Sequence, residues 1–523
     1  MKKNKIFIVL LLVILFSLSF RVPIAQKYPT GTDTYTMYKL STDIQQKKYI
    51  EWILSPISLT GYFPLSYQTG GILLLSEISL ILGTNFFNTL IYWDIFMIIV
   101  IGVLIYLIAK TIFKNNFLSI ISVLVYLNVR FLIYYTTWYY SVRNLFLILF
   151  VTFIWLLLSK KFRFKYTLIF IICTLMIITH KLFIVLPILL LSYLIAYFVW
   201  KKEIHKSKFF AHIILLLTTT LFIGSVFING IIKLAPTIGP SFKIHNVFLN
   251  QLVYLIFTYA TQIGLTAFFF VIGYLALIYK KNKDRNDIFI IVTFILFAPI
   301  LTEPTYIGYI ILPFFAITIV YGIKFLIERR VFNTLFYKKM IIVILLIFLI
   351  APMFIKTYTV YDDSIQPRDQ TIQLTNYFMK INDTKTVICN YHEIYCNHIT
   401  ALSENSIPSL STSSDLLNVK KFNISNISII YSLKKIAIFK EPIFDRDYFD
   451  EMYEGYLIRY HPDKITATRI VDFFKIEYIV DTNFIESVSN ENSIRNAFGG
   501  FNNQIYNNGL QKVQYLGAQN KDE

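Results

Sequence analysis

Long apolar runs separated by short polar and basic stretches dominate the chain. A run of about 20 apolar residues can cross the ~30 Å hydrocarbon core of a bilayer as a helix. The first run covers residues 6–25, and the later runs that fit as spans are 87–109, 117–133, 143–159, 166–179, 181–200, 209–230, 249–279, 288–301, 306–326 and 340–356. The pattern predicts a multi-span α-helical membrane protein with about 11 transmembrane helices.

Basic clusters close one span and open the next, as in "KKFRFK" (160–165), "KKEIHKSK" (201–208), "KKNKDR" (280–285) and "ERRVFNTLFYKK" (328–339). Because excess Lys and Arg mark the cytoplasmic side, all of these clusters fall on one side of the membrane. We therefore expect a multi-pass protein of the cell membrane with a cytoplasmic N-terminus. The residues after 356 are then outside.

Composition agrees with this interpretation, since 56% of the 523 residues are hydrophobic and only 15% are charged. A soluble protein of this size cannot bury so much apolar surface. The net charge of +18 lies in clusters between the apolar runs rather than on one face, so it indicates topology and no nucleic-acid partner.

The first apolar run is either a cleaved signal peptide or an uncleaved anchor. We favour the anchor, because no small-residue cleavage site is clear, and we expect Arg21 to snorkel to the outer interface. The chain then stays outside from residue 26 to residue 83. A connection of this length is typical of an active-site loop. Its apolar part, "GYFPLSYQTGGILLLSEISLILG" (61–83), is expected to lie along the interface rather than to cross.

The composition becomes polar near residue 357, which divides the chain into residues 1–356 and an outer domain, 357–523. Strand-like pieces at 385–390, 434–439, 475–481 and 511–516 alternate with helical segments at 367–381, 443–457 and 464–474. This alternation predicts a small extracytoplasmic α/β domain.

Several of these features together resemble the GT-C superfamily of membrane glycosyltransferases, in its oligosaccharyltransferase-like branch. They are the first span, the long outer loop with Asp33 in "GTDTY" (31–35), the aromatic and proline segment leading to "LLLSEISLILG" (73–83), and the outer α/β domain. The resemblance implies transfer of a sugar from a polyprenyl-phosphate-linked donor, at the outer face of the membrane, to a protein, lipid or glycan acceptor.

Asp33 matches the first-loop acid of that family, where a carboxylate takes the acceptor proton or holds a divalent cation such as Mg²⁺ or Mn²⁺. Glu303, in "ILTE" (300–303), is a looser match to a second outer-loop acid. Asp33 is equally compatible with a turn or helix-cap role after Gly31, and Glu303 with simple solvation at a hairpin.

Four cationic side chains lie at the outer ends of predicted spans, against the positive-inside bias: Arg130, Arg143, His180 and Lys181. They are candidates for binding the donor phosphate, because Arg offers a bidentate fork to phosphate oxygens. The alternative is that they cap span ends or pair with Asp94, an acid near the outer end of its own span.

The chain also departs from the oligosaccharyltransferase pattern. The segment 130–144 contains no acid, and the "WWDYG" motif of the acceptor site is missing. These departures argue against asparagine-linked transfer and against a tightly bound metal, and the missing acid keeps a catalytically degenerate scaffold as an alternative. The other competing interpretation is a lipid or polysaccharide transporter or flippase, which would also be polytopic with basic loops. In "CNYHEIYCNH" (389–398), Cys389 and Cys396 are expected to form a disulfide or remain free thiols rather than bind zinc with His392 and His398.

Overall fold

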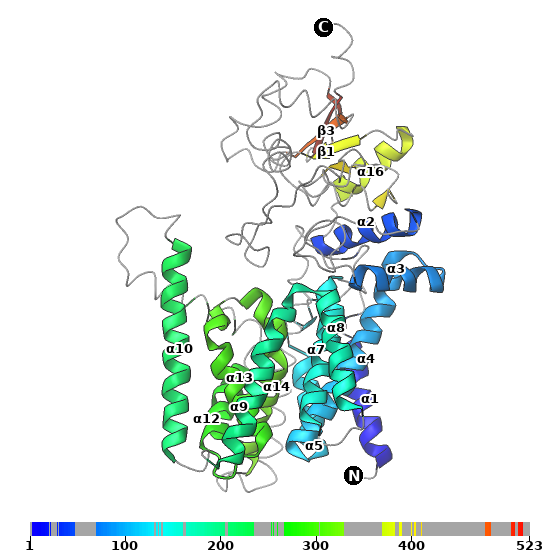
Figure 1. Cartoon of the computed structure of the whole chain (residues 1–523). Helices are drawn as coiled ribbons and strands as arrows, with labels where there is room; N and C mark the ends of the chain where they lie inside the picture. The colour runs from blue at the N-terminus through cyan, green and yellow to red at the C-terminus, as the bar shows by residue number, and fades with distance from the viewer. Residues whose placement is uncertain are drawn as a thin grey trace. The chain divides into compact units, whose positions relative to one another are not determined.

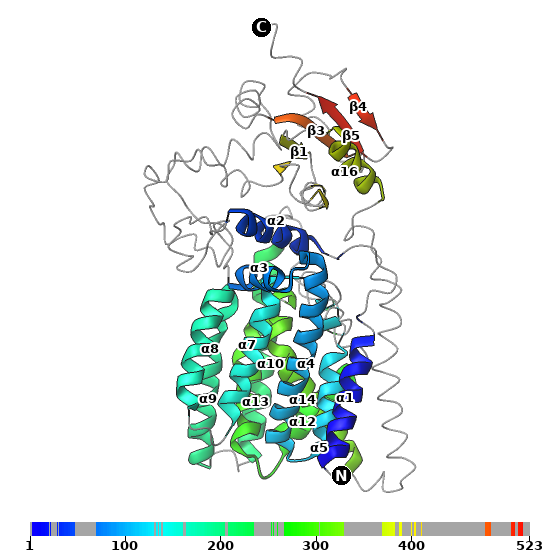
Figure 2. The same cartoon turned by 90° about the vertical axis from the view of Figure 1, so that its right-hand side faces the viewer.

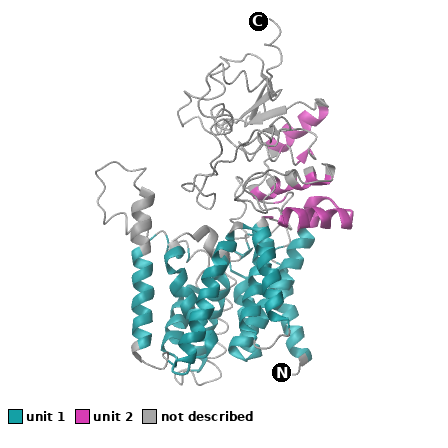
Figure 3. Ribbon diagram, in the orientation of Figure 1, with its two compact units in different colours: residues 1–24, 91–138, 143–360 teal, residues 25–90, 139–142, 361–523 magenta. Residues whose placement is uncertain are grey.

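The structure, a computed structural model, divides the chain into two compact units (Figure 3). Unit 1 consists of residues 1–24, 91–138 and 143–360, and unit 2 of residues 25–90, 139–142 and 361–523. The residues that the structure describes are 3–19, 21, 29, 31–47, 70–129, 132–133, 135–136, 140–159, 164–203, 208–234, 253, 255, 259, 266–302, 304–328, 369–381, 386–389, 399, 402–403, 409–410, 476–482, 504–507 and 511–515.

Unit 1 is built from apolar helices, from the 12 residues of α5 to the 28 residues of α4 (Figures 1 and 2). They are α1 (Lys3–Ser19), α4 (Phe86–Phe113), α5 (Asn116–Leu127), α7 (Val142–Leu158), α8 (Lys165–Thr179), α9 (Leu186–Lys201), α10 (Lys208–Leu234), α12 (Ala267–Tyr279), α13 (Arg285–Phe297) and α14 (Pro304–Glu328), with the first residues of α4 and α7 counted in unit 2. Two 3₁₀ turns, η2 (Lys181–Val185) and η5 (Ala298–Thr302), precede α9 and α14.

Three helices in the described part of the chain are long and apolar enough to cross a membrane: Phe86–Phe113, Leu182–Lys201 and Ile310–Glu328. The other apolar helices of unit 1 coincide with predicted apolar runs but are shorter or less completely described. The predicted run 340–356 lies outside the described residues. The structure thus has the helices of a membrane protein, while the count of crossings stays a prediction.

Close backbone contact joins α12 to α14. A Cβ added at Gly273 would lie 1.9 Å from the carbonyl oxygen of Thr318, and one added at Gly322 would lie 2.1 Å from that of Phe269. Small residues at these positions let the two helix backbones approach, as is usual where apolar helices pack in a membrane. An aromatic cluster of Phe270, Phe294 and Phe315, with ring centroids 4.5 to 5.6 Å apart, fills the space beside them.

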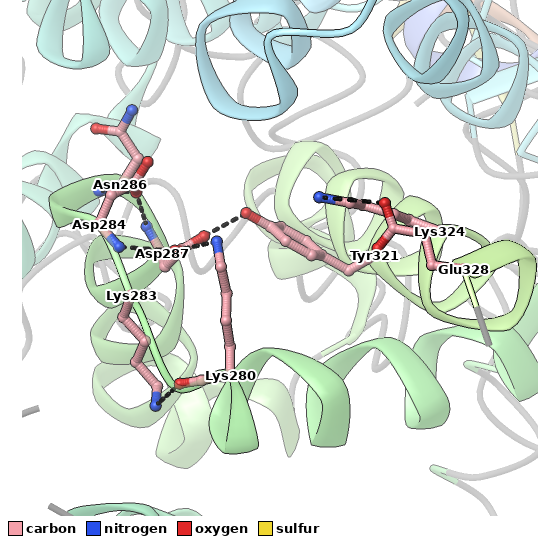
Figure 4. Close-up of polar contacts among 8 residues, drawn as sticks. All are labelled: Lys280, Lys283, Asp284, Asn286, Asp287, Tyr321, Lys324 and Glu328. Atoms are coloured by element: carbon pink, nitrogen blue, oxygen red, sulfur yellow. Dashed lines mark hydrogen bonds and ion pairs between the residues drawn. The ribbon is translucent and has the colours of Figure 1, made fainter. Parts of the chain in front are cut away.

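A polar network joins α12, α13 and α14 (Figure 4). Asp287, which is fully buried, accepts hydrogen bonds from Lys280 Nζ at 2.6 Å and from the Tyr321 hydroxyl. Asp284 and Asp287 form a capping box that starts α13. Burial lowers the pKa of Lys283, and the charge of Asp287 opposes part of that fall. The ammonium of Lys283 donates to the Lys280 carbonyl at 2.7 Å, which closes the turn between α12 and α13.

Unit 2 contains α2 (Thr32–Lys47), α3 (Gly70–Leu82), α16 (Asp369–Ile381) and one five-stranded sheet. The sheet has the order β2-β1-β3-β5-β4, with strands β1 (Thr386–Cys389), β2 (Ser409–Leu410), β3 (Ile476–Thr482), β4 (Gln504–Asn507) and β5 (Gln511–Tyr515). Strand β1 pairs in parallel with β2 and β3, and β5 pairs antiparallel with β3 and β4. Three strands and α16 coincide with predicted elements, and the predicted strand 434–439 lies outside the described residues.

Helix α2 packs against α3 and against the start of α4. Ser41 Oγ on α2 lies 2.7 Å from Ser76 Oγ on α3, and Tyr38 on α2 stacks on Phe87 at the start of α4, with ring centroids 4.6 Å apart. At 13 residues, α3 covers the C-terminal part of the segment 61–83, and the expectation that this segment lies along the interface stays a prediction.

The α12–α14 contact gives a stability prediction. Gly273→Ala should lower the free energy of unfolding by about 1–3 kcal/mol, because the new methyl group must displace a backbone carbonyl. Gly224→Ala in α10 is the matched control, since no heavy atom lies within 4 Å of its added Cβ. That change should stabilise the helix by about 0.5–1 kcal/mol. Thermal midpoints of the purified proteins in one detergent measure both effects, and equal midpoints would contradict the packing argument.

Candidate functional site

The polar stretch after the first apolar run folds into a fixed turn at the start of α2. Gly31 has a φ of +84°, a left-handed conformation that favours glycine. The Tyr35 hydroxyl donates to the Pro29 carbonyl at 2.8 Å, and the Thr34 N–H donates to the Gly31 carbonyl at 3.2 Å. The turn therefore sets where the first helical residues of α2 lie.

Asp33 lies in the first turn of α2, and its side chain is half-buried. A helix N-terminus carries a partial positive charge and stabilises a carboxylate in this position. The neighbours of Asp33 along the helix, Thr34 and Tyr35, are fully buried, so the helix face that they occupy is fixed. The arrangement suits a structural carboxylate at a helix start and equally a carboxylate that is held in place for catalysis.

Tyr140 forms hydrogen bonds to both α2 and α3 within unit 2. Its backbone N–H donates to Thr34 Oγ1 at 2.9 Å, and its hydroxyl donates to the Gly71 carbonyl at 2.6 Å. Its ring packs edge-on against Phe86 at 6.3 Å. The residue beside Asp33 is thus tied to a segment 106 positions away in the chain. Sequence analysis missed this contact, because nothing in the local pattern around Tyr140 indicates its partner.

In unit 1, Arg21 is buried at the end of α1, with 4% of its surface exposed. Its Nε donates to Thr136 Oγ1 at 2.6 Å, Nη1 to the Ser17 carbonyl at 2.5 Å, and Nη2 to the Leu127 carbonyl. The expectation that Arg21 snorkels to the outer interface is therefore wrong. Hydrogen-bond acceptors on α1 and α5 and on the segment after α5 satisfy the guanidinium inside the unit.

Asp94 on α4 is also buried, with 6% of its surface exposed, and its negative charge acts on Arg21. From the sequence we expected Arg130 or Arg143 to pair with Asp94. Nothing in the sequence pointed to Arg21. An intramembrane acid and a nearby cation commonly compensate each other in an apolar bundle. Asp94 and Arg21 together link α1, α4 and α5 electrostatically.

Two of the cationic candidates lie on neighbouring elements of unit 1. Arg143 is in the first turn of α7, and its side chain is half-buried. His180 is buried between α8 and η2, where its Nδ1 accepts a hydrogen bond from the Leu182 N–H at 3.1 Å and caps η2. Its ring lies 5.9 Å from that of Phe146, one turn along α7 from Arg143. His180 thus has a structural role next to the helix that carries Arg143.

The remaining candidates are described less fully. Lys181 begins η2, and only its backbone is described, while Arg130 and Glu303 lie outside the described residues. In the Cys and His segment, Cys389 ends β1, and His392, Cys396 and His398 lie outside the described residues. The roles of these residues stay predictions.

Comparison with known proteins identifies the fold. No family model matches the chain, and no curated protein sequence matches it. Among solved structures, the Archaeoglobus fulgidus oligosaccharyltransferase in the apo form matches with a TM-score of 0.60 and 11% identity, over 92% of this chain and 70% of that chain. The chain has an oligosaccharyltransferase-like fold.

Further structures of the oligosaccharyltransferase from that organism agree. A complex of AglB with an inhibitory peptide and a dolichol-phosphate matches with a TM-score of 0.58 and 11% identity, over 92% of this chain and 70% of that chain. A complex with Zn and sulfate gives 0.56 and 12%, over 91% and 68%. The family resemblance predicted from the sequence is confirmed at the level of the fold. At such low identity, the likeness does not extend to the reaction.

Burial of Arg21 gives a second stability prediction. Arg21→Met should lower the free energy of unfolding by about 1–3 kcal/mol, because it leaves the buried Leu127 carbonyl without its donor and removes a positive charge on which Asp94 acts. Lys5→Met is the control, since Lys5 is an exposed cation on α1, the helix that precedes Arg21, and should tolerate the change. The double variant Arg21→Met with Asp94→Asn should recover part of the loss. Thermal midpoints measure all three, and equal midpoints for the two single variants would contradict the interpretation.

Proposed function

We propose that the chain is a membrane glycosyltransferase of the GT-C kind, which moves a sugar from a polyprenyl-phosphate-linked donor to an acceptor at the outer face of the membrane. The observation that carries the proposal is the oligosaccharyltransferase-like fold over 92% of the chain. A lipid donor is supported by the complex of the archaeal AglB with a dolichol-phosphate. The half-buried carboxylate of Asp33, fixed at the start of α2, supplies the acid that such a transfer needs.

The proposed topology is that of a multi-pass protein with about 11 spans, a cytoplasmic N-terminus and an extracytoplasmic α/β domain from residue 357 onward. Support comes from the apolar helices of unit 1, which coincide with the predicted runs, and from the basic clusters between those runs. The parallel pairing of β1 with β2 and β3, with α16 before β1, supports an α/β domain.

In the proposed reaction, a nucleophilic atom of the acceptor forms a bond to the anomeric carbon of the sugar. The bond from that carbon to the donor phosphate breaks, and its electron pair leaves with the polyprenyl phosphate. Asp33 takes the acceptor proton as general base, and Glu303 is the second candidate acid. Arg130, Arg143, His180 and Lys181 are the candidates that bind the phosphate and stabilise its developing charge.

A divalent cation is compatible with Asp33. Mg²⁺ and Mn²⁺ prefer oxygen ligands, and Mg²⁺ is commonly held by one or two carboxylates together with substrate phosphates. The half-buried Asp33 side chain fits such a site as one ligand. The archaeal oligosaccharyltransferase was crystallised with Zn and sulfate, which supports use of a metal in this fold. A bound cation would add positive charge beside the donor phosphate.

The acceptor that we propose is a protein, a lipid or a glycan. An archaeal oligosaccharyltransferase with this fold was captured with a tethered acceptor peptide that contains the NVT sequon. This chain lacks the "WWDYG" motif and has no acid in residues 130–144, so those two features give no support to asparagine-linked transfer. The same missing acid supports the competing interpretation as a catalytically degenerate scaffold.

Replacing Asp33 tests the proposed function. Asp33→Asn keeps the shape of the side chain and its turn-forming ability but removes the charge. If Asp33 is catalytic, the variant should fold but lose activity by roughly 10²-fold or more. The assay follows transfer of radiolabelled sugar from membrane lipid in a strain that lacks the native protein.

Glu77→Gln is the matched control, because Glu77 is an exposed carboxylate on α3 of the same unit and should tolerate the change. Near-normal transfer by Asp33→Asn would remove Asp33 from the mechanism. No transfer by the unaltered protein with any donor would favour the scaffold interpretation.

Replacing Arg143 tests donor binding. Arg143→Ala should weaken the apparent affinity for the polyprenyl-phosphate-sugar donor roughly tenfold or more, as expected for loss of a charge-assisted hydrogen bond. Arg143→Lys should recover only part of the affinity, because Lys lacks the bidentate fork. Lys202→Ala, which removes an exposed cation of the same unit, is the control. Unchanged donor affinity in both Arg143 variants would leave Arg143 with a structural role at the start of α7.

A further inference from the structure

Two cations in unit 1, Lys165 and Arg285, share one aromatic ring. The Arg285 Cζ lies 5.0 Å from the centroid of the Tyr193 ring, and the Lys165 Nζ lies 5.8 Å from it. Lys165 begins α8, Arg285 begins α13, and Tyr193 lies on α9, which packs against α13 (Figure 2). The two positive charges are close enough to repel each other. Their convergence therefore costs free energy unless an anion compensates it.

Lys165 is held in place by neutral groups. Its Nζ donates to the Leu157 carbonyl at 3.0 Å and to the Ser159 carbonyl at 2.9 Å, at the C-terminal end of α7. Such carbonyls stabilise a cation but carry only partial charge. An ammonium has three donors, and these two bonds use two of them. The position of the charge is fixed, and one N–H is left for an acceptor.

The acids nearest in sequence to Arg285 are engaged elsewhere. The Asp284 carboxylate accepts from the backbone N–H groups of Asn286 and Asp287, and Asp287 accepts from Lys280 and Tyr321 (Figure 4). Among the residues that the structure describes, no carboxylate pairs with Lys165 or with Arg285. An anion from outside the chain would supply the missing charge.

The surroundings of the pair match the head-group level of a membrane. Phe164 and Tyr166, on either side of Lys165, have 60% and 83% of their surfaces exposed, and Trp200 near the end of α9 has 43%. Exposed aromatic side chains beside apolar helices form the belt that lies at the membrane interface. The cluster "KKNKDR" (280–285) ends at Arg285, so this is a basic end of the unit. A phosphate at this level belongs to a lipid.

We propose that Lys165, Arg285 and Tyr193 form a binding site for the phosphate of an anionic phospholipid. Arg285, oriented by the Tyr193 ring, offers its fork to two phosphate oxygens, and Lys165 offers its remaining N–H to a third. The site lies at the opposite end of α8 from His180, about 22 Å away at 1.5 Å per residue. It is therefore separate from the donor-phosphate residues proposed above and does not depend on the catalytic proposal.

The test titrates the purified full chain in detergent with dioctanoyl phosphatidylglycerol, with dioctanoyl phosphatidylcholine and with inorganic phosphate, following the thermal midpoint. A ligand that binds the folded state raises the midpoint in a concentration-dependent way, which gives an apparent affinity. Phosphatidylglycerol should raise the midpoint, and the other two should not. Arg285→Gln should weaken the affinity for phosphatidylglycerol about fivefold or more, as expected for one basic residue near anionic lipid. The affinity of Arg285→Lys for phosphatidylglycerol should lie between that of the unaltered protein and that of Arg285→Gln.

Lys281→Gln is the matched control, because it removes an equal charge from an exposed side chain four positions away. It should leave the affinity for phosphatidylglycerol near that of the unaltered protein. Equal losses in Arg285→Gln and Lys281→Gln would show a general surface-charge effect and overturn the site. A midpoint rise with inorganic phosphate equal to that with phosphatidylglycerol would overturn the lipid assignment. If Arg285→Gln fails to fold, an unchanged affinity in Arg285→Lys overturns the bidentate contact.

Discussion

Compensation of buried charge is the constraint on which the helical unit depends. An apolar bundle supplies no water, so a charged side chain inside it must find hydrogen-bond partners and an opposing charge within the protein. Arg21 does so with the Ser17 and Leu127 carbonyls, Thr136 and the charge of Asp94, and thereby links α1, α4 and α5. Asp287 does so with Lys280 and Tyr321 and links α12, α13 and α14. Polar groups thus fix the relative positions of helices whose apolar faces are much alike.

The same constraint explains which parts of the fold could be predicted from the sequence. Helices such as α4, α8 and α10 follow from runs of apolar residues, because each run carries its own signal. The partners of Arg21 could not be predicted, since Leu127 and Thr136 lie 106 and 115 positions away. The local pattern predicts that a cation after an apolar run lies at the interface. Tertiary contacts bury Arg21 instead.

Around Asp33, too, part of the local structure could be predicted from the sequence and part could not. Pro29 and Gly31 mark the turn before α2 in the sequence, and the turn forms as those residue types favour. The hydrogen bonds from Tyr140 to Thr34 and Gly71 join segments that α4 and α5 separate in the sequence. No periodic pattern indicates these bonds. Sequence therefore locates Asp33 at a turn but does not show what holds the turn. A catalytic acid needs that support, because a small displacement of a reacting group lowers the rate steeply.

The cations of unit 1 show how neighbours decide the chemistry of one residue type. In the proposed topology, the positive-inside bias accounts for the presence of Lys165 and Arg285 at a basic end of the unit, but it does not account for their convergence on Tyr193. Arg21, in contrast, uses three of its five N–H donors on protein acceptors, and it is buried where an outside ligand of the kind that Arg285 can bind does not reach it. A buried arginine whose guanidinium donates to carbonyls within the protein links helices. A half-buried arginine that contacts only an aromatic ring still has its N–H donors for an anion, so the hydrogen bonds that each arginine makes distinguish the two roles.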